Sequence, residues 1–183
     1  MFCSTIDITT MKTYKLGSGE DRILTVKKCD SDYVVTLRIK NDDVKYVELS
    51  SKRWAAFRQL VNDINTGVKA LMKGEKGVKL QLHIGGGYYV SVTSGISCVD
   101  FRKFYKPYDA VDGDIKATRR GVALRLEEWS HLCTLIDTIN AAFPTLGSTL
   151  PCYYDVDHTD PTTSITCTEC CPFGHNQHCV CPH

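Results

Sequence analysis

Hydrophobic residues recur along this chain with two different periods, and each period predicts a different element. Over 33–40 the sequence YVVTLRIK places Val35, Leu37 and Ile39 on one side of an extended segment, because successive side chains of a strand alternate. From 129 to 143 apolar residues return at steps of three and four, which is the spacing of one helical face. The pattern therefore predicts strands followed by a long amphipathic helix.

The helical pattern occurs twice in the chain. Its apolar positions are Trp54, Phe57, Leu60, Val61, Ile64 and Val68 in the first stretch and Trp129, Leu132, Leu135, Ile136, Ile139 and Phe143 in the second, each pair separated by 75 residues. The extended stretches match more loosely, with Leu16-Gly17 parallel to Ile84-Gly85. We interpret this as an internal duplication over 12–73 and 78–145, joined by the polar segment 73–77. Two unrelated amphipathic helices are the alternative.

Each repeat is predicted to form a four-stranded antiparallel sheet followed by one helix, which is an α+β arrangement. An apolar helical stripe needs a surface to cover it, so we expect the two repeats to bury their stripes together as an intrachain pseudo-dimer. After Pro144 the chain becomes rich in Thr, Ser, Asp, Gly and Pro. Residues 146–183 are therefore interpreted as a linker and a Cys/His-rich tail.

Composition narrows the class of protein. The 183 residues are 43% hydrophobic and 23% charged, values that are ordinary for a globular protein. No stretch approaches the roughly 20 apolar residues of a membrane span, and the first residues lack the basic and then apolar order of a secretory signal. We therefore expect an intracellular protein with no membrane partner.

Charge is distributed unevenly along the chain. All 22 Lys and Arg residues lie between Lys12 and Arg125, together with 13 acidic residues, whereas the rest of the chain has eight acidic residues and no Lys or Arg. Such asymmetry is typical of a nucleic-acid-binding part joined to an acidic part. An ordinary solvated basic surface is the alternative interpretation.

Three passages resemble, in order and spacing, the transcriptional positive cofactor four family: IGGGYYVSV (84–92), VDFRKFY (99–105) and RRGVALRLEEW (119–129). The resemblance implies a coactivator that binds single-stranded DNA and acts in transcription, replication or repair at melted DNA. It also implies a nuclear or otherwise intracellular location and the transcription machinery as a partner. In that family two units from two chains dimerise through their helices, so this chain is expected to be a monomeric pseudo-dimer.

Binding a single strand with little sequence preference requires cations for the phosphates and flat side chains for the bases. The segment FRKFYKPY (101–108) interleaves both kinds. By resemblance Arg102, Tyr105 and Arg120 occupy positions of the DNA-binding face, and Arg38 and Lys40 match them in the first repeat. The candidate nucleic-acid-binding residues are Lys27, Lys28, Arg38, Lys40, Tyr88, Arg102, Lys103, Phe104, Tyr105, Arg119 and Arg120. The expected partner is single-stranded DNA, with RNA left open.

Two observations bear on other functions. The hairpin TSGIS (93–97) is short and uncharged where the resembled family has basic and aromatic residues. The alternative function is therefore a protein-interaction scaffold that has lost the DNA-binding face and acts through its acidic, Cys-rich tail. No phosphate-binding loop with Lys, nucleophile elbow or HExxH motif occurs, so we do not expect an enzyme.

The tail contains six of the ten cysteines, between Cys152 and Cys181. Cys167 and Cys170 have the spacing of a metal-binding knuckle, whose turn brings both sulfurs to one tetrahedral ion. His175 and Cys179 follow, and the predicted zinc ligands are therefore Cys167, Cys170, His175 and Cys179, with His178 or Cys181 as alternative fourth ligands. A disulfide-bonded tail and a metal-free tail remain open.

Overall fold

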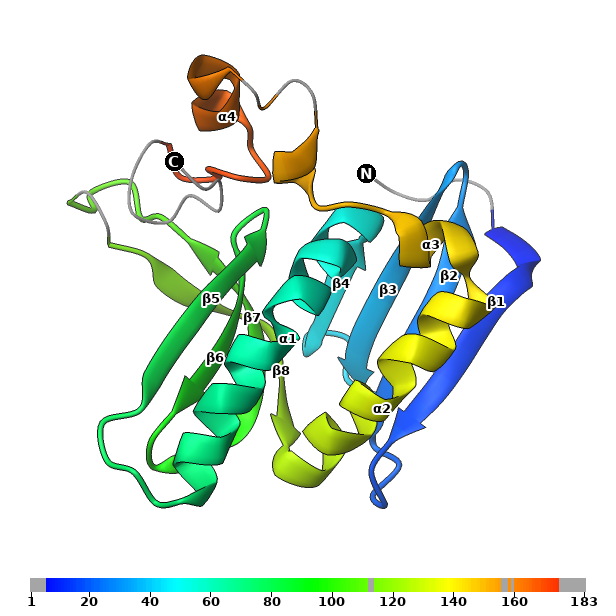
Figure 1. Cartoon of the computed structure of the whole chain (residues 1–183), viewed down its shortest axis with the longest axis horizontal. Coiled ribbons are helices and arrows are strands. Elements are labelled where there is room, and N and C mark those ends of the chain that lie inside the picture. The colour runs from blue at the N-terminus through cyan, green and yellow to red at the C-terminus, as the bar shows by residue number, and fades with distance from the viewer. Residues whose placement is uncertain (1–5, 112–113, 156–157, 159, 175–183) are drawn as a thin grey trace.

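Two four-stranded antiparallel sheets form the frame of the protein, and each has its strands in sequential order (Figure 1). The computed structural model describes residues 6–111, 114–155, 158 and 160–174. The first sheet contains β1 (Ile6–Leu16), β2 (Arg22–Cys29), β3 (Asp32–Ile39) and β4 (Tyr46–Ser50). The second contains β5 (Lys79–Gly85), β6 (Tyr88–Thr93), β7 (Ile96–Tyr105) and β8 (Lys116–Arg125).

A helix follows each sheet without a connecting loop, namely α1 (Ser51–Met72) and α2 (Leu126–Ala142). The Ser50 hydroxyl accepts the Arg53 backbone N–H at 3.4 Å, and the Glu128 carboxylate accepts the Arg125 N–H at 2.7 Å, so each first turn is capped by a side chain. The expected α+β fold of two sheet-plus-helix repeats is confirmed. In the tail, the structure adds α3 (Pro144–Ser148), the 3-10 turn η1 (Cys152–Tyr154) and α4 (Pro161–Thr166).

Each helix lies across the boundary between the two repeats. Helix α1 packs on β5 and β6 of the second sheet as well as on β3 and β4, and α2 packs on β1 as well as on β7 and β8 (Figure 1). Helix α1 comes close to β5 at Gly67, where the lack of a side chain makes room. A Cβ added at Gly67 would lie 3.0 Å from Leu80 Cδ2 on β5. The repeats are therefore intertwined through their helices, which is the predicted intrachain pseudo-dimer.

One hydrophobic core serves both repeats. The Phe57 ring lies 5.3 Å from the Phe101 ring and 6.1 Å from the Trp129 ring, so residues of α1, β7 and α2 meet at its centre. Trp54, Phe57, Phe101 and Trp129 are each at most 2% exposed. Burying each of these side chains contributes about 1.5–3 kcal/mol, which explains why both apolar stripes face inward.

Strand alternation leaves each sheet with one covered face and one open face. In the first sheet the buried residues Leu24, Leu37 and Val47 face the helices. Their neighbours along the strands, such as Thr25 and Arg38, point to the opposite, open face. In the described part of the chain no helix is long and apolar enough to cross a bilayer.

Candidate metal centre and nucleic-acid interface

Three cysteines and one histidine of the tail converge on a single point. Cys152 begins η1, Cys167 follows α4, Cys170 lies in the next turn, and the fourth member is His158. Their donor atoms all lie within 4.8 Å of one another, and Cys152 Sγ is 3.6 Å from Cys167 Sγ and 3.5 Å from His158 Nε2. Zn–S bonds of about 2.3 Å in a tetrahedron separate two sulfurs by about 3.8 Å. The four side chains are therefore close enough to hold one metal ion.

The turn between Cys167 and Cys170 prepares one thiol for metal binding. Burial acts to raise the pKa of Cys167, but backbone N–H groups of Cys170 and Glu169 and the His158 side chain lower this pKa to about 7. Burial, followed by the nearby Cys167 thiol, raises the pKa of Cys152 to about 12. A bound cation favours thiolates over thiols, so metal binding would release the protons that this site retains.

The structure brings together two of the four predicted metal ligands. Cys167 and Cys170 lie in the group as expected, whereas His175 and Cys179 lie outside the described residues. The group is completed by Cys152 and His158, which the sequence argument did not select. The sequence does show Cys152 and His158 as a second pair of residues able to bind a metal, upstream of Cys167 and Cys170. Only the reversal of the chain through α4 brings the two pairs together.

A disulfide also occurs in the tail, at Cys171. The cysteines outside any disulfide, among the described residues, are Cys29, Cys98, Cys133, Cys152, Cys167 and Cys170. The three cysteines of the metal group are therefore reduced, while their neighbour Cys171 is oxidised. The tail thus contains both a group of thiols close enough to hold a metal ion and a disulfide-bonded cysteine.

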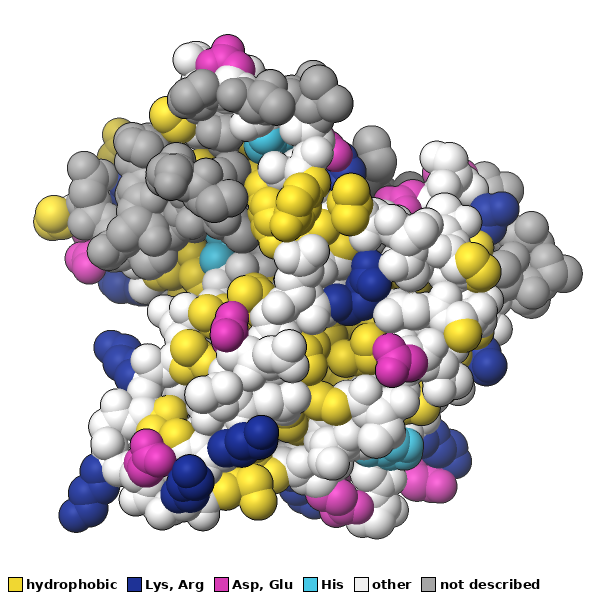
Figure 2. Space-filling view, viewed as in Figure 1, with side chains coloured by type: hydrophobic (Ala, Val, Ile, Leu, Met, Phe, Trp, Pro, Cys, Tyr) yellow, Lys and Arg dark blue, Asp and Glu magenta, His cyan; other side chains and the backbone are white. Residues whose placement is uncertain are grey.

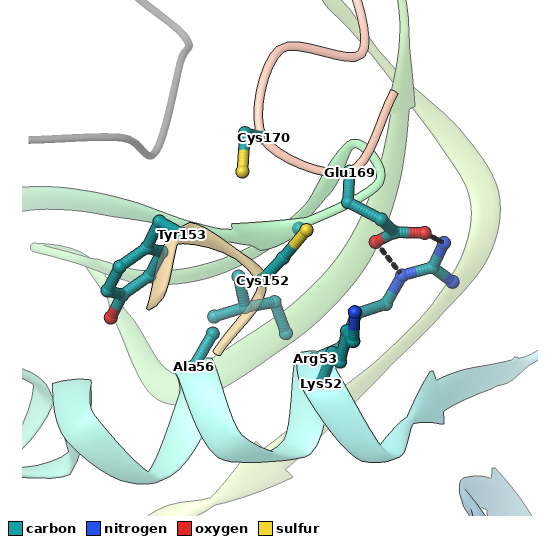
Figure 3. A pocket seen from close by; sticks show the side chains of 9 residues that line it. Lys52, Arg53, Ala56, Cys152, Tyr153, Glu169 and Cys170 are labelled. Carbon is teal, nitrogen blue, oxygen red and sulfur yellow. Dashed lines mark hydrogen bonds and ion pairs between the residues drawn. The ribbon is translucent and has the colours of Figure 1, made fainter. Parts of the chain in front are cut away.

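The turn that carries Cys167 and Cys170 is fastened to the body of the protein through Glu169, which lies between them in sequence (Figure 3). Arg53 in the first turn of α1 donates to the Glu169 carboxylate through Nε at 2.7 Å and also through Nη2. The Gly86 N–H, in the turn between β5 and β6, donates to the Glu169 carbonyl at 2.7 Å. This clasp, defined by Arg53, Glu169 and Gly86, connects the tail to both repeats.

The helix-bearing face of the molecule does not gather basic side chains. Figure 2 shows Lys and Arg side chains scattered over this face, separated by acidic, apolar and other surface. A groove for a polyanion needs cations in one place. The candidate nucleic-acid surface therefore has to be sought on the open faces of the sheets.

The open face of the first sheet contains a hollow of about 430 Å³ that includes two of the predicted residues, Lys27 and Arg38. We call this the first-sheet hollow. It is lined by Met11, Thr13, Thr25, Lys27, Thr36, Arg38, Asp42, Asp43, Tyr46 and Glu48. The second repeat reaches the same place, because the Arg120 guanidinium lies 5.0 Å above the Tyr46 ring. The hollow thus contains two candidates, Lys27 and Arg38, while a third, Arg120, does not line it but lies against the ring of Tyr46, which does.

The open face of the second sheet carries Arg102 and Phe104 in a different setting. The Phe104 ring packs edge-on against Tyr89 at 5.0 Å, and His83 stacks on the other side of Tyr89 at 4.8 Å. Tyr89 is only 2% exposed, so this cluster is packed and does not present an open platform to a base. The sequence suggested Tyr89 as a stacking residue beside Tyr88 but gave no indication of His83, since alternate positions on paired strands become neighbours only once the register is known.

Three of the candidate residues point away from the open faces. Lys28 shares the helix-covered face with Leu24 and Val26, because even and odd positions of β2 alternate. Tyr88 is 6% exposed and lies between Arg53 at 5.0 Å and Lys103 at 4.8 Å.

Lys103 is the third of these residues. Its ammonium group donates to the Gly86 carbonyl, and burial, followed by repulsion from Arg53, lowers the pKa of Lys103. Tyr88 and Lys103 therefore belong to the tail-docking region. The remaining candidates are all exposed: Lys40 follows β3, Tyr105 ends β7, and Arg119 lies within β8.

No protein-family model, curated protein or solved structure matches the chain. Its function is therefore argued from the two sites described above and from the sequence resemblance.

Proposed function

We propose that the chain is a binding protein for single-stranded nucleic acid, with DNA as the first candidate, and that the strand lies in the first-sheet hollow. The observation that carries the proposal is that Lys27, Arg38 and Tyr46 line one hollow on an open sheet face, with the Arg120 guanidinium stacked on the Tyr46 ring. Cations there would hold phosphates, and the Tyr46 ring, already covered by a guanidinium, offers a flat surface beside them.

Arg38 supports this role because its hydrogen-bonding capacity is unused. Its Nε is buried and has no hydrogen-bond partner among the described residues. No ion pair among the described residues joins the Arg38 guanidinium to a carboxylate, so its charge is left for a phosphate that enters the hollow.

Acidic residues at the same hollow limit the expected affinity. Asp42 is engaged by the backbone N–H groups of Val44 at 3.0 Å and Lys45 at 2.9 Å, but Asp43 and Glu48 also line the hollow. Their charge opposes that of the nearby cations. We therefore expect moderate affinity carried by a few phosphates.

We infer further that the tail binds zinc. Three thiolates and one imidazole at tetrahedral separations form a common structural zinc site, and four protein ligands leave no open position for a substrate. The ion would hold η1, α4 and the Glu169 turn together, so its role is structural and the protein is proposed not to be an enzyme. Elemental analysis of protein purified without chelator tests this, with about one equivalent of zinc expected and under about 0.2 contradicting it.

The biological setting follows from the resemblance alone. We propose action at melted DNA in transcription, replication or repair, in the nucleus or elsewhere inside the cell, with the transcription machinery as a protein partner. RNA remains an alternative ligand, because a phosphate-and-stacking surface does not by itself exclude it.

Fluorescence anisotropy with a labelled single-stranded oligonucleotide tests the proposal. Titrations at two salt concentrations, beside a duplex of the same sequence and an RNA strand, should show a preference for the single strand that weakens as salt rises. Equal binding to single strand and duplex, or no binding to either, would contradict it.

A protein-interaction scaffold is the second candidate function. The observation that favours it concerns the second sheet. On the face that no helix covers, Tyr89 is buried and Arg102 is paired with Asp100, so little is left there to bind a strand. Retention of a protein partner by the tail, together with undetectable oligonucleotide binding, would select this function.

A further inference from the structure

The two repeats place an arginine at the same point of their open faces. Leu37 in β3 and Phe101 in β7 are buried residues of the third strand in each sheet, and each is paired with a buried valine of the fourth strand. Arg38 follows the first and Arg102 follows the second, so both arginines point to the open face. They are equivalent in backbone position, and any difference between them arises from their neighbours.

Arg102 uses all three of its nitrogens in hydrogen bonds within the protein. Its Nε and Nη2 donate to the two carboxylate oxygens of Asp100 at 2.8 and 3.0 Å, and its Nη1 donates to the Thr118 carbonyl at 3.0 Å. The Arg102 and Asp100 side chains are 27% and 25% exposed, which limits screening by water. A phosphate that binds this guanidinium in a bidentate manner through Nε and Nη2 has to displace a carboxylate, and the charge of Arg102 is already balanced by Asp100.

Arg38 has no such partner. The residue two positions before it is Thr36, where the second repeat has Asp100. Glu48, the nearest carboxylate on β4, pairs across the strands with Thr36, and no ion pair within the described residues joins it to Arg38. Together with the unsatisfied Nε, this leaves Arg38 as the available guanidinium of the pair.

We propose that the chain binds a single strand on one sheet only, with Arg38 as the phosphate anchor and Asp100 as the residue that closes the equivalent site of the second repeat. This inference rests on the proposed function and adds to it a stoichiometry of one strand per chain. The duplication thus gives two sheets with an arginine at the same position. The residue two positions earlier is Thr36 in the first sheet and Asp100 in the second, and this difference decides which arginine accepts a phosphate.

Alanine variants and a reciprocal exchange test the inference. Arg38→Ala should weaken oligonucleotide binding at least tenfold, because it removes the anchor, whereas Arg102→Ala should change it less than twofold. Asp100→Thr should free Arg102 and strengthen binding or create a second site, and it should restore part of the affinity in the Arg38→Ala background. Thr36→Asp should reproduce the loss seen in Arg38→Ala.

All four variants change the net charge. The two alanine variants remove the same charge and control for each other, whereas the two exchanges that remove or add a carboxylate need matched controls. Thr138→Asp adds the same charge on the exposed surface of α2, and Asp63→Thr removes one from α1. Both should leave affinity within twofold of the original protein. Circular dichroism melts exclude variants that do not fold, and if Thr36→Asp is among these, Asp100→Thr and the alanine pair still decide the question.

A direct readout is the NMR signal of the arginine Nε–H groups during titration with an unlabelled dT oligonucleotide. The Arg38 signal should shift with the bound fraction, while the Arg102 signal stays in place until Asp100 is replaced. Equal losses in Arg38→Ala and Arg102→Ala, a larger loss in the latter, or two strands per unmodified chain would overturn the inference but keep the proposed function. Absence of binding by the unmodified chain would overturn both.

Discussion

Trp129 of α2 donates a hydrogen bond from its indole Nε1 to Asn65 Oδ1 of α1, at 2.9 Å. The same contact occurs a second time with the helices exchanged, because Trp54 Nε1 donates to Asn140 Oδ1 at 3.2 Å. Both residues of the first pair lie 75 positions from their counterparts in the second. The duplicated apolar stripes are therefore joined by a duplicated polar contact, which sets how the two helices cross.

Replacing either asparagine by alanine should destabilise the protein to a similar degree. Each change leaves a buried indole N–H without an acceptor, at a cost of about 1–3 kcal/mol in the free energy of unfolding. Urea titration of Asn65→Ala and Asn140→Ala measures this, with Thr138→Ala on the exposed side of α2 as the control. A loss from only one of the two variants would show that the reciprocal contacts are not equivalent in energy.

Zinc content should depend on Cys152, His158, Cys167 and Cys170. His158→Ala and Cys170→Ser should each lower bound zinc well below one equivalent, because a structural site needs its complete ligand set. Cys98→Ser removes a thiol from the second sheet and should leave the metal content unchanged. Full zinc occupancy in His158→Ala would mean that the ligand set differs from the four residues described.

The clasp should protect the turn between β5 and β6. In Glu169→Gln the paired charge is lost while the neighbouring thiols of Cys167 and Cys170 remain, so the Gly86 amide should exchange with solvent faster. The loss in overall stability should be about 1 kcal/mol, because the pair is only partly buried. Hydrogen exchange measures the local effect, Glu75→Gln in the exposed segment after α1 is the control, and unchanged exchange at Gly86 would contradict the clasp.

Alkylation should distinguish the thiols of the sheet and the helix. Burial raises the pKa of Cys98 and Cys133, and Asp100 raises the pKa of Cys98 further. Thiolates are the reactive form, so both residues should react more slowly than free cysteine at pH 7.5 and accelerate only at more alkaline pH. Mass spectrometry after iodoacetamide treatment follows each site.

The same experiment has an internal comparison. Asp100→Thr should speed the modification of Cys98 and leave Cys133 unchanged, because Asp100 influences only the first of these thiols. A rate at Cys98 equal to that of free cysteine in the unmodified protein would contradict the described environment.

Local pattern was sufficient for the architecture. The positions Trp54 and Trp129, each opening an apolar stripe, predicted two equivalent helices, and the alternation around Leu37 predicted the strand on which Arg38 lies. Periodicity works for such features because each depends on burial of one face of one element. The knuckle spacing of Cys167 and Cys170 is local in the same sense.

What the sequence by itself determined was therefore the duplication, the α+β class and two members of the metal group. Only the tertiary structure decided that Cys152 and His158 complete that group, that Lys28, Tyr88 and Lys103 point away from the open faces, and that Arg120 of one repeat reaches Tyr46 of the other. The physical reason is that these relations depend on chain reversals and strand register, which bring distant residues within a few ångströms and leave no periodic signal in the sequence.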